Sequence, residues 1–300
     1  MTDPTSPSAA PTPVAADGAP ERPVAPGTAA PTADAAWDPR QYAVFAGHRG
    51  RPYADLLARV DAPGPRVVVD LGCGPGELTS GLAARWPRAR VVGVDSSPEM
   101  LARAAEQDPS GRVEWVQADV ATWQPPAGVD LLVTNATLQW VPGHLDLLPR
   151  WVEALAPGGW FAMQVPGNFD APSHALLREV AAASARAGEL TPVLRGGAAV
   201  ADPGTYAATL AGLGCSIDVW ETTYLHVLDP EGAQESPVLE WTKGTALRPV
   251  LQVLTDEGER ARFLAAYARR LEQAYPRQPF GTVFPFRRIF AVAQRPGGTA

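Results

Sequence analysis

The residues best suited to chemistry lie in one short run in the first third of the chain. Residues 66–76 read Arg-Val-Val-Val-Asp-Leu-Gly-Cys-Gly-Pro-Gly. Three successive β-branched valines predict a buried strand. Asp70 ends that strand, and Gly72, Gly74 and Gly76 predict a turn whose backbone lets a ligand approach closely. A strand, a glycine turn and a following helix N-terminus indicate a nucleotide site at the carboxyl edge of a parallel sheet.

The spacing of these glycines separates two kinds of nucleotide ligand. The dinucleotide fingerprint is Gly-x-Gly-x-x-Gly, but Glu77 stands three residues after Gly74. Its carboxylate would lie near a bound pyrophosphate, which disfavours a nicotinamide dinucleotide. S-adenosylmethionine has no phosphate, and its sulfonium is a cation that tolerates a nearby carboxylate. The pattern Asp-x-Gly-x-Gly-x-Gly therefore favours S-adenosylmethionine as cofactor, with a tight turn in another α/β domain as the alternative.

Polar residues also follow the next three predicted strands. Asp95 follows strand 89–94, where a carboxylate can accept hydrogen bonds from both ribose hydroxyls. Asp119 follows strand 113–117 and can accept from an adenine amino group, and Asn135 follows strand 129–134. Carboxyl ends of parallel strands share one sheet edge, so these residues predict a single cofactor site. The predicted cofactor residues are Tyr42, Asp70, Gly72, Gly74, Gly76, Asp95, Ser96, Asp119, Val120, Asn135 and Trp140.

Composition excludes several other classes of protein. The net charge of −7 argues against a nucleic-acid partner, which would require a basic stripe. No apolar stretch approaches the ~20 residues that span a bilayer. Cys73 and Cys215 lack the paired spacing of a disulfide framework or a metal site, which fits a reducing cytoplasm and predicts no metal.

The chain divides into a short tail and one long domain. Residues 1–36 contain eight prolines, eleven alanines and no aromatic residue, which predicts a disordered tail. The domain is expected over 37–295, with a flexible end at 296–300. Helices are predicted at 144–155 (closed by 157–159, with His144 on the surface), 173–185, 204–213, 239–254 and 257–274, and strands at 160–165, 217–227 and 283–293. Segments 170–200 and 229–282 are predicted to form a lid over the acceptor, because loops this long usually carry function.

Several of these segments resemble one enzyme family. Residues 66–165 are similar to class I S-adenosylmethionine-dependent methyltransferases. The resemblance to the trans-aconitate 2-methyltransferase family runs from Trp37 to about Arg295. It includes Gly47-His48-Arg49-Gly50-Arg51-Pro52, Asn135-Ala136-Thr137-Leu138-Gln139-Trp140, Trp220-Glu221-Thr222-Thr223-Tyr224, Leu247-Arg248-Pro249 and Phe284-Pro285-Phe286-Arg287-Arg288. It implies an α/β fold, a Rossmann-like seven-stranded sheet with helical lid insertions, and monomethyl esterification of trans-aconitate.

Such a small polyanionic acid sets its own chemical demands. A carboxylate with a pKa of ~4 is already ionised at neutral pH, so no residue is predicted as a general base. The carboxylates that do not react need cations and hydrogen-bond donors. The predicted acceptor residues are His48, Arg49, Tyr224, His226, Arg248 and Arg288. Arg287 and Arg288 must face opposite sides of their strand, and Arg288 is preferred. The alternatives are methyl transfer to carbon or oxygen of a secondary metabolite, or a non-catalytic cofactor-binding module. The oligomeric state is left open.

Overall fold

A mixed β-sheet organises residues 46–298, which are the residues that the computed structural model describes. The predicted Tyr42 and the 1–36 tail lie outside them. The strands follow the order β3-β2-β1-β4-β5-β8-β6, and β7 pairs with β8. They are β1 (Val67–Leu71), β2 (Arg90–Asp95), β3 (Val113–Gln117), β4 (Val129–Asn135), β5 (Leu155–Pro166), β6 (Ser216–Leu228), β7 (Arg277–Gln278) and β8 (Gly281–Gln294). The seven predicted strands are confirmed, and the two-residue β7 was not predicted.

The first five strands are parallel and aligned, so that their polar ends meet. β1 lies between β2 and β4, with Asp70 opposite both Gly93 and Val133. Asn135, at the end of β4, pairs with Gln164 on β5. Val68 and Val69 of β1 are buried on opposite faces of the sheet, as expected for a central parallel strand. The alignment gathers Asp70, Asp95 and Asn135 at the carboxyl edge.

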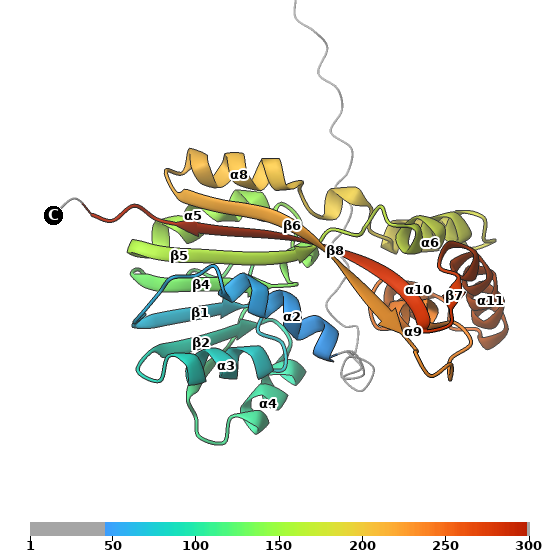
Figure 1. Cartoon of the computed structure of the whole chain (residues 1–300), viewed down its shortest axis with the longest axis horizontal. Helices are drawn as coiled ribbons and strands as arrows, with labels where there is room; N and C mark the ends of the chain where they lie inside the picture. Colours follow the sequence, from blue (N-terminus) through green and yellow to red (C-terminus); the bar gives the residue numbers. More distant parts are fainter. Residues whose placement is uncertain (1–45, 299–300) are drawn as a thin grey trace, which may run out of the picture. The chain divides into compact units, whose positions relative to one another are not determined.

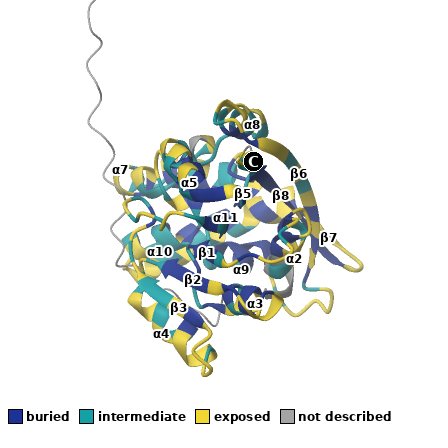
Figure 2. Ribbon diagram, turned by 90° about the vertical axis from the view of Figure 1, so that its left-hand side faces the viewer, coloured by how far each residue is buried: buried dark blue, intermediate teal, exposed yellow. Residues whose placement is uncertain are grey.

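Helices cover both faces of this sheet (Figure 1). Leu56 of α2 and Leu82 of α3 pack with Val68 and Val133 on one face. On the other face, side chains of α5 and α8 pack with alternate residues of the same strands. The buried strands and the exposed outer sides of the helices are distinguished in Figure 2. The helices on these faces are α2 (Ala46–Leu57), α3 (Glu77–Arg85), α4 (Pro98–Gln107), α5 (Leu148–Ala154) and α8 (Pro203–Gly212).

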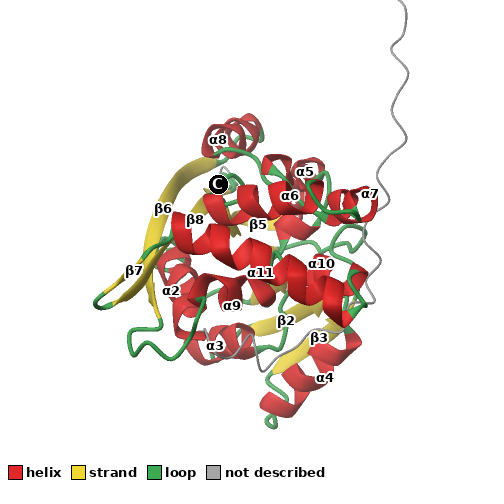
Figure 3. Ribbon diagram, turned by 90° about the vertical axis from the view of Figure 1, so that its right-hand side faces the viewer, coloured by secondary structure: helices red, strands yellow, loops and turns green. Residues whose placement is uncertain are grey.

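The last two long strands extend beyond the sheet and carry a second hydrophobic core. β6 and β8 pair over thirteen residues, from Ser216↔Gln294 to Leu228↔Thr282. Their far ends pack against helices of the predicted lid, around Trp241, Tyr267 and Phe284 (Figures 1 and 3). These helices are α6 (Pro172–Ala182), α7 (Ala187–Leu190), α9 (Pro237–Lys243), α10 (Arg248–Val253) and α11 (Glu257–Ala274). The lid segments therefore form a folded layer with an interior of its own.

Three local predictions were wrong for identifiable reasons. The helix predicted over 239–254 is two helices, because the chain turns at Gly244 and resumes at Arg248-Pro249. Residues 157–159 do not close a helix but lie within β5, where the pairing with β4 shifts register. His144 is 5% exposed and bonds through Nε2 to the Tyr206 hydroxyl at 2.7 Å, so it is not a surface residue.

No helix among residues 46–298 is both long and apolar enough to cross a membrane.

Candidate active site

The glycine turn leaves open backbone at its centre. Gly72, Gly74 and Gly76 have φ values of 75°, 55° and 86°, which L-residues rarely adopt. A Cβ on Gly72 would lie 2.1 Å from Thr137 Oγ1, and one on Gly76 would lie 2.7 Å from Ala104 Cβ. A Cβ on Gly74 would meet nothing within 4 Å. The outer glycines are therefore required by packing, whereas Gly74 presents backbone that a ligand can contact.

Asp95 fastens this turn to the next helix. Its Oδ2 accepts from the Gly74 amide and its Oδ1 from the Ser97 amide, each at 2.9 Å. Ser97 in turn caps α4 by accepting from the Met100 amide at 3.2 Å. A carboxylate offers about four lone-pair positions, so both oxygens retain capacity for a ligand. Asp95 can accept from ribose hydroxyls while it holds the turn in place.

Asp70 is a buried acid at the same edge. It is 3% exposed, and its Oδ2 accepts from Thr79 Oγ1 at 2.6 Å. Burial raises the pKa of Asp70 to about 7, with Thr79 opposing the rise and Asp95 adding to it. A buried carboxylate that is difficult to ionise is stabilised when a cation binds beside it. This setting suits a ligand with positively charged groups, such as S-adenosylmethionine.

The remaining predicted cofactor residues differ in exposure. Asp119 is exposed, and its Oδ1 accepts from the Ala121 amide at 2.8 Å. Val120 belongs to the buried core. The Asn135 side-chain oxygen is buried and has no hydrogen-bond partner among residues 46–298. Trp140 is 45% exposed, and the Arg195 guanidinium lies 3.3 Å from its ring centroid. The vacant acceptor atom of Asn135 fits a ligand that donates hydrogen bonds at this edge.

Three predicted acceptor residues lie on one face of the β6–β8 pair. Arg288 on β8 pairs with Thr222 on β6. Tyr224 and His226 follow Thr222 on β6 by two and four residues, so their side chains share its face. The Tyr224 and His226 rings stack with centroids 6.4 Å apart, and His226 also stacks on Trp241 of α9 at 5.0 Å. The Tyr224 hydroxyl donates to Asp55 of α2 at 2.6 Å. Arg288 is 6% exposed, whereas Arg287 pairs with Glu221 on the opposite face, so the two arginines face opposite sides of their strand as predicted.

Arg248 lies in a predicted lid segment and interacts electrostatically with α4. It is the first residue of α10 and is half-buried. Burial lowers the pKa of its guanidinium, and the nearby carboxylate of Glu99 opposes that effect. Glu99 lies in the first turn of α4, directly after the segment that Asp95 holds. The side chains of His48 and Arg49 lie outside the described part of the structure, although their backbone begins α2.

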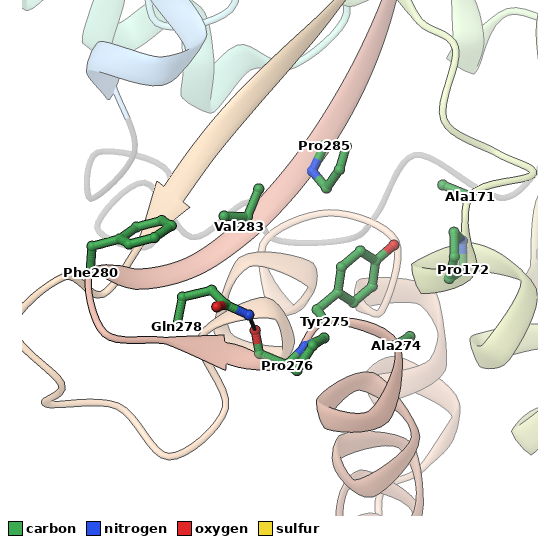
Figure 4. A pocket seen from close by; sticks show the side chains of 9 residues that line it. All are labelled: Ala171, Pro172, Ala274, Tyr275, Pro276, Gln278, Phe280, Val283 and Pro285. Carbon is green, nitrogen blue, oxygen red and sulfur yellow. Dashed lines mark hydrogen bonds between the residues drawn. The ribbon is translucent and has the colours of Figure 1, made fainter.

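An apolar groove of about 510 Å³ lies elsewhere, between the start of α6, the end of α11 and the β7–β8 turn (Figure 4). Its lining includes Pro172, Phe280 and Pro285. Among the described residues that line it there is no arginine, lysine or histidine, so this lining is poorly suited to a polyanion.

Comparison with known proteins identifies the family. A family model described as a methyltransferase domain matches residues 68–159. A trans-aconitate 2-methyltransferase of Streptomyces avermitilis is 54% identical over 271 residues, which are 88% of this chain and 99% of the relative. That of Rhodococcus jostii is 52% identical over 260 residues, covering 86% and 99%. The chain belongs to the trans-aconitate 2-methyltransferase family.

The fold of this trans-aconitate 2-methyltransferase family member also occurs in more distant proteins. The YcgJ protein of Bacillus subtilis matches with a TM-score of 0.53 at 11% identity, over 83% of this chain and all of that protein. This likeness concerns the fold alone. The predicted Rossmann-like class I methyltransferase sheet with helical insertions is thereby confirmed.

One buried polar residue of this family member was not among the residues considered for the acceptor. Gln164 is 1% exposed at the end of β5, next to Asn135. A lone glutamine in the otherwise apolar run 160–165 was a signal that the sequence contained. Arg195 is half-buried and donates to the Gln139 carbonyl at 3.3 Å. Its position depends on how the lid folds against Trp140, which no local pattern indicates.

Proposed function

We propose that this protein transfers the methyl group of S-adenosylmethionine to a carboxylate of a small polyanionic acid, with trans-aconitate as the leading acceptor and a monomethyl ester as product. One observation carries the proposal: the 54% identity covers 99% of the length of a trans-aconitate 2-methyltransferase. The similarity therefore includes the lid segments and not only the methyltransferase domain at 68–159.

The donor half of the proposed site consists of acids and open backbone. When bound, S-adenosylmethionine supplies a methyl group on a sulfonium whose departure leaves a neutral thioether. Asp95 is assigned to the ribose hydroxyls and Asp119 to the adenine amino group. Asp70 is assigned to the positively charged end, since its buried carboxylate has a raised pKa and gains from a cation. Gly74 supplies backbone without a side chain.

The acceptor half requires cations rather than a base. The acceptor carboxylate is ionised at neutral pH, so the protein must remove water from it and orient it, with reacting atoms held ~3–3.5 Å apart. We assign Arg248, Arg288, Tyr224 and His226 to the acceptor. Buried Arg288 and half-buried Arg248 lie on different elements, β8 and α10, and so can hold an acid from two sides. His48 and Arg49 remain acceptor candidates from the sequence.

The setting proposed for this reaction is the cytoplasm. Cys73 and Cys215 are both buried and unpaired, which supports a reducing compartment. The proposed partners are the cofactor and one small acid, and no nucleic acid or membrane is included.

The test is methyl transfer from radiolabelled S-adenosylmethionine to trans-aconitate, cis-aconitate, citrate, isocitrate and isopropylmalate at equal concentration. We expect trans-aconitate to react much faster than the other acids and to yield a methyl group that mild alkali releases. Tight binding of S-adenosylmethionine with no acid methylated would overturn the acceptor assignment. Faster methylation of carbon or of a hydroxyl oxygen would favour a secondary-metabolite methyltransferase.

A further inference from the structure

Buried amide side chains with vacant hydrogen-bonding atoms gather where β4 and β5 end. Gln164 is 1% exposed and Asn168 is 3% exposed. Among residues 46–298, nothing accepts from Gln164 Nε2, and neither side-chain atom of Asn168 has a partner. Asn135 Oδ1 and Gln139 Oε1 likewise have no hydrogen-bond partner among these residues. Buried polar atoms are nearly always hydrogen-bonded, so four such residues together indicate a place for a polar ligand.

Strand register places these groups beside the proposed donor site. Gln164 is the direct neighbour of Asn135, and its backbone carbonyl accepts from the Ala136 amide at 2.9 Å. Gln139 Nε2 donates to the Ala136 carbonyl at 2.5 Å. Side chains alternate along a strand, so Gln164 shares a face with Ala162, which packs in the core under α2 and α3. Asp70 on β1 and Asn135 on β4 project from this same face, two residues beyond Val68 and Val133.

Arg288 fixes the orientation of Gln164. Its Nη1 donates to Gln164 Oε1 at 3.4 Å, and its guanidinium lies 4.4 Å from the centroid of the Phe286 ring. Because the amide oxygen faces the guanidinium, the amide NH₂ faces away from it. The two side chains together present a cation and a neutral N–H donor, a combination that suits a carboxylate.

We propose that Gln164, oriented by Arg288, binds a carboxylate of the acceptor that is not methylated. This inference rests on the proposed function and adds a specificity residue to it. Hydrogen bonds from a guanidinium and an amide stabilise the negative charge on a carboxylate and so reduce its nucleophilicity. The carboxylate bound here is therefore a poor nucleophile for the methyl group. Its binding determines which of the other two carboxylates is methylated. Asn168, two residues beyond the end of β5, supplies a second vacant donor for the same acid.

The decisive experiment combines the substitution Gln164→Leu with substrate analogues that each lack one carboxylate. Glutaconate, mesaconate and itaconate each lack a different carboxylate of trans-aconitate. For Gln164→Leu we expect kcat/KM for trans-aconitate to fall 10- to 100-fold, with the KM for S-adenosylmethionine within twofold of wild type. One of the three dicarboxylates should lose less than threefold, because it lacks the carboxylate that Gln164 binds. Gln164→Glu should lose more than Gln164→Leu, since it sets a carboxylate against a carboxylate.

Gln294 provides a matched control on the same sheet. It lies on β8 opposite Trp160, at the other end of the β5–β8 pair, and donates to the Gly158 carbonyl at 3.0 Å. Gln294→Leu should leave the preference among the four acids unchanged. Equal losses on all four acids for Gln164→Leu, or a twofold or smaller loss on trans-aconitate, would overturn the proposal.

A binding titration keeps this inference separate from the proposed function. Trans-aconitate is titrated into wild type and Gln164→Leu, each saturated with S-adenosylhomocysteine, so that no transfer occurs. We expect Kd to rise 10-fold or more in the variant, and an unchanged Kd would refute the contact. If wild type methylates no acid, the proposed function fails. A Gln164-dependent Kd would then still establish a polycarboxylate site.

Discussion

Replacement of Asp70 by asparagine should stabilise the protein at neutral and alkaline pH while it weakens cofactor binding. Burial holds the pKa of Asp70 at about 7 in the folded protein, against 3.8 for the unperturbed group. The folded state therefore binds this proton more tightly than the unfolded state. Wild type loses stability from this group as the pH rises from about 4 to 7, and nothing further is lost above that range.

The size of the effect follows from the difference between the two pKa values. A difference of about three pKa units corresponds to about 4 kcal/mol at pH 8, since each unit is worth about 1.4 kcal/mol. At pH 5 the pH is only about one unit above the unperturbed pKa, so wild type has lost only about 1.5 kcal/mol of stability. Asparagine has nearly the same shape, cannot ionise, and can still accept from Thr79 Oγ1 through its own oxygen.

The assay is urea unfolding of wild type and Asp70→Asn at pH 5 and pH 8 without cofactor. We expect the variant to be the more stable protein, by a margin that grows by about 2–3 kcal/mol between the two pH values. The same variant should bind S-adenosylmethionine less tightly at pH 8, because it lacks the carboxylate that faces a cation. A stability difference that does not depend on pH, or a variant that is less stable at pH 8, would show that burial does not raise the pKa of Asp70 in the folded protein.

Four further predictions concern the two halves of the site and the tail. Asp95→Ala should weaken S-adenosylmethionine binding by ~1.5–3 kcal/mol in isothermal titration, because charge-assisted hydrogen bonds are lost; unchanged affinity would contradict the ribose assignment. Arg248→Ala should raise the KM of the acid at least tenfold and that of the cofactor less than threefold, and equal changes would remove Arg248 from the acceptor site. With S-adenosylmethionine saturating, so that its positive charge keeps the Asp70 carboxylate ionised, kcat should stay flat from about pH 6 to 8, because the acceptor needs no base and because burial, with Arg195 and Arg178 adding to it, lowers the pKa of His174 to about 4; a steep limb near pH 7 under these conditions would indicate a general base. Deletion of residues 1–36 should leave kcat and both KM values within twofold, and loss of activity would show that the tail takes part.

Those parts of the fold that depend on local pattern were predicted well. α11 matches its predicted bounds, since its apolar period is regular and Asp256 caps it by accepting from the Glu259 amide at 2.8 Å. The valine-rich strand before Asp70 and the capped start of α4 likewise follow from neighbouring residues. The break at Gly244 was missed because the apolar period continues across it, and only packing against the lid core decides where the chain turns.

The candidate site was predicted unevenly for a similar reason. The predicted cofactor residues follow strands, and the ends of strands can be located from the hydrophobic pattern of the sequence. The acceptor half of the site depends on which long-range neighbours meet. The contacts of Arg288 with Gln164 and of Arg195 with Trp140 join residues 124 and 55 positions apart. The resemblance implied a polyanionic acceptor, and the local sequence then favoured Arg248 and Arg288, but neither gave a reason to single out Gln164.

The most direct test of the proposed function is to locate the transferred methyl group. Trans-aconitate is incubated with the protein and S-adenosylmethionine carrying a ¹³C-labelled methyl, and the product is examined by NMR before and after mild alkali. The proposed function predicts a single labelled methyl on one carboxylate oxygen, released as methanol on alkaline hydrolysis. A labelled methyl on carbon, or no transfer to trans-aconitate by protein that binds S-adenosylmethionine tightly, would contradict it.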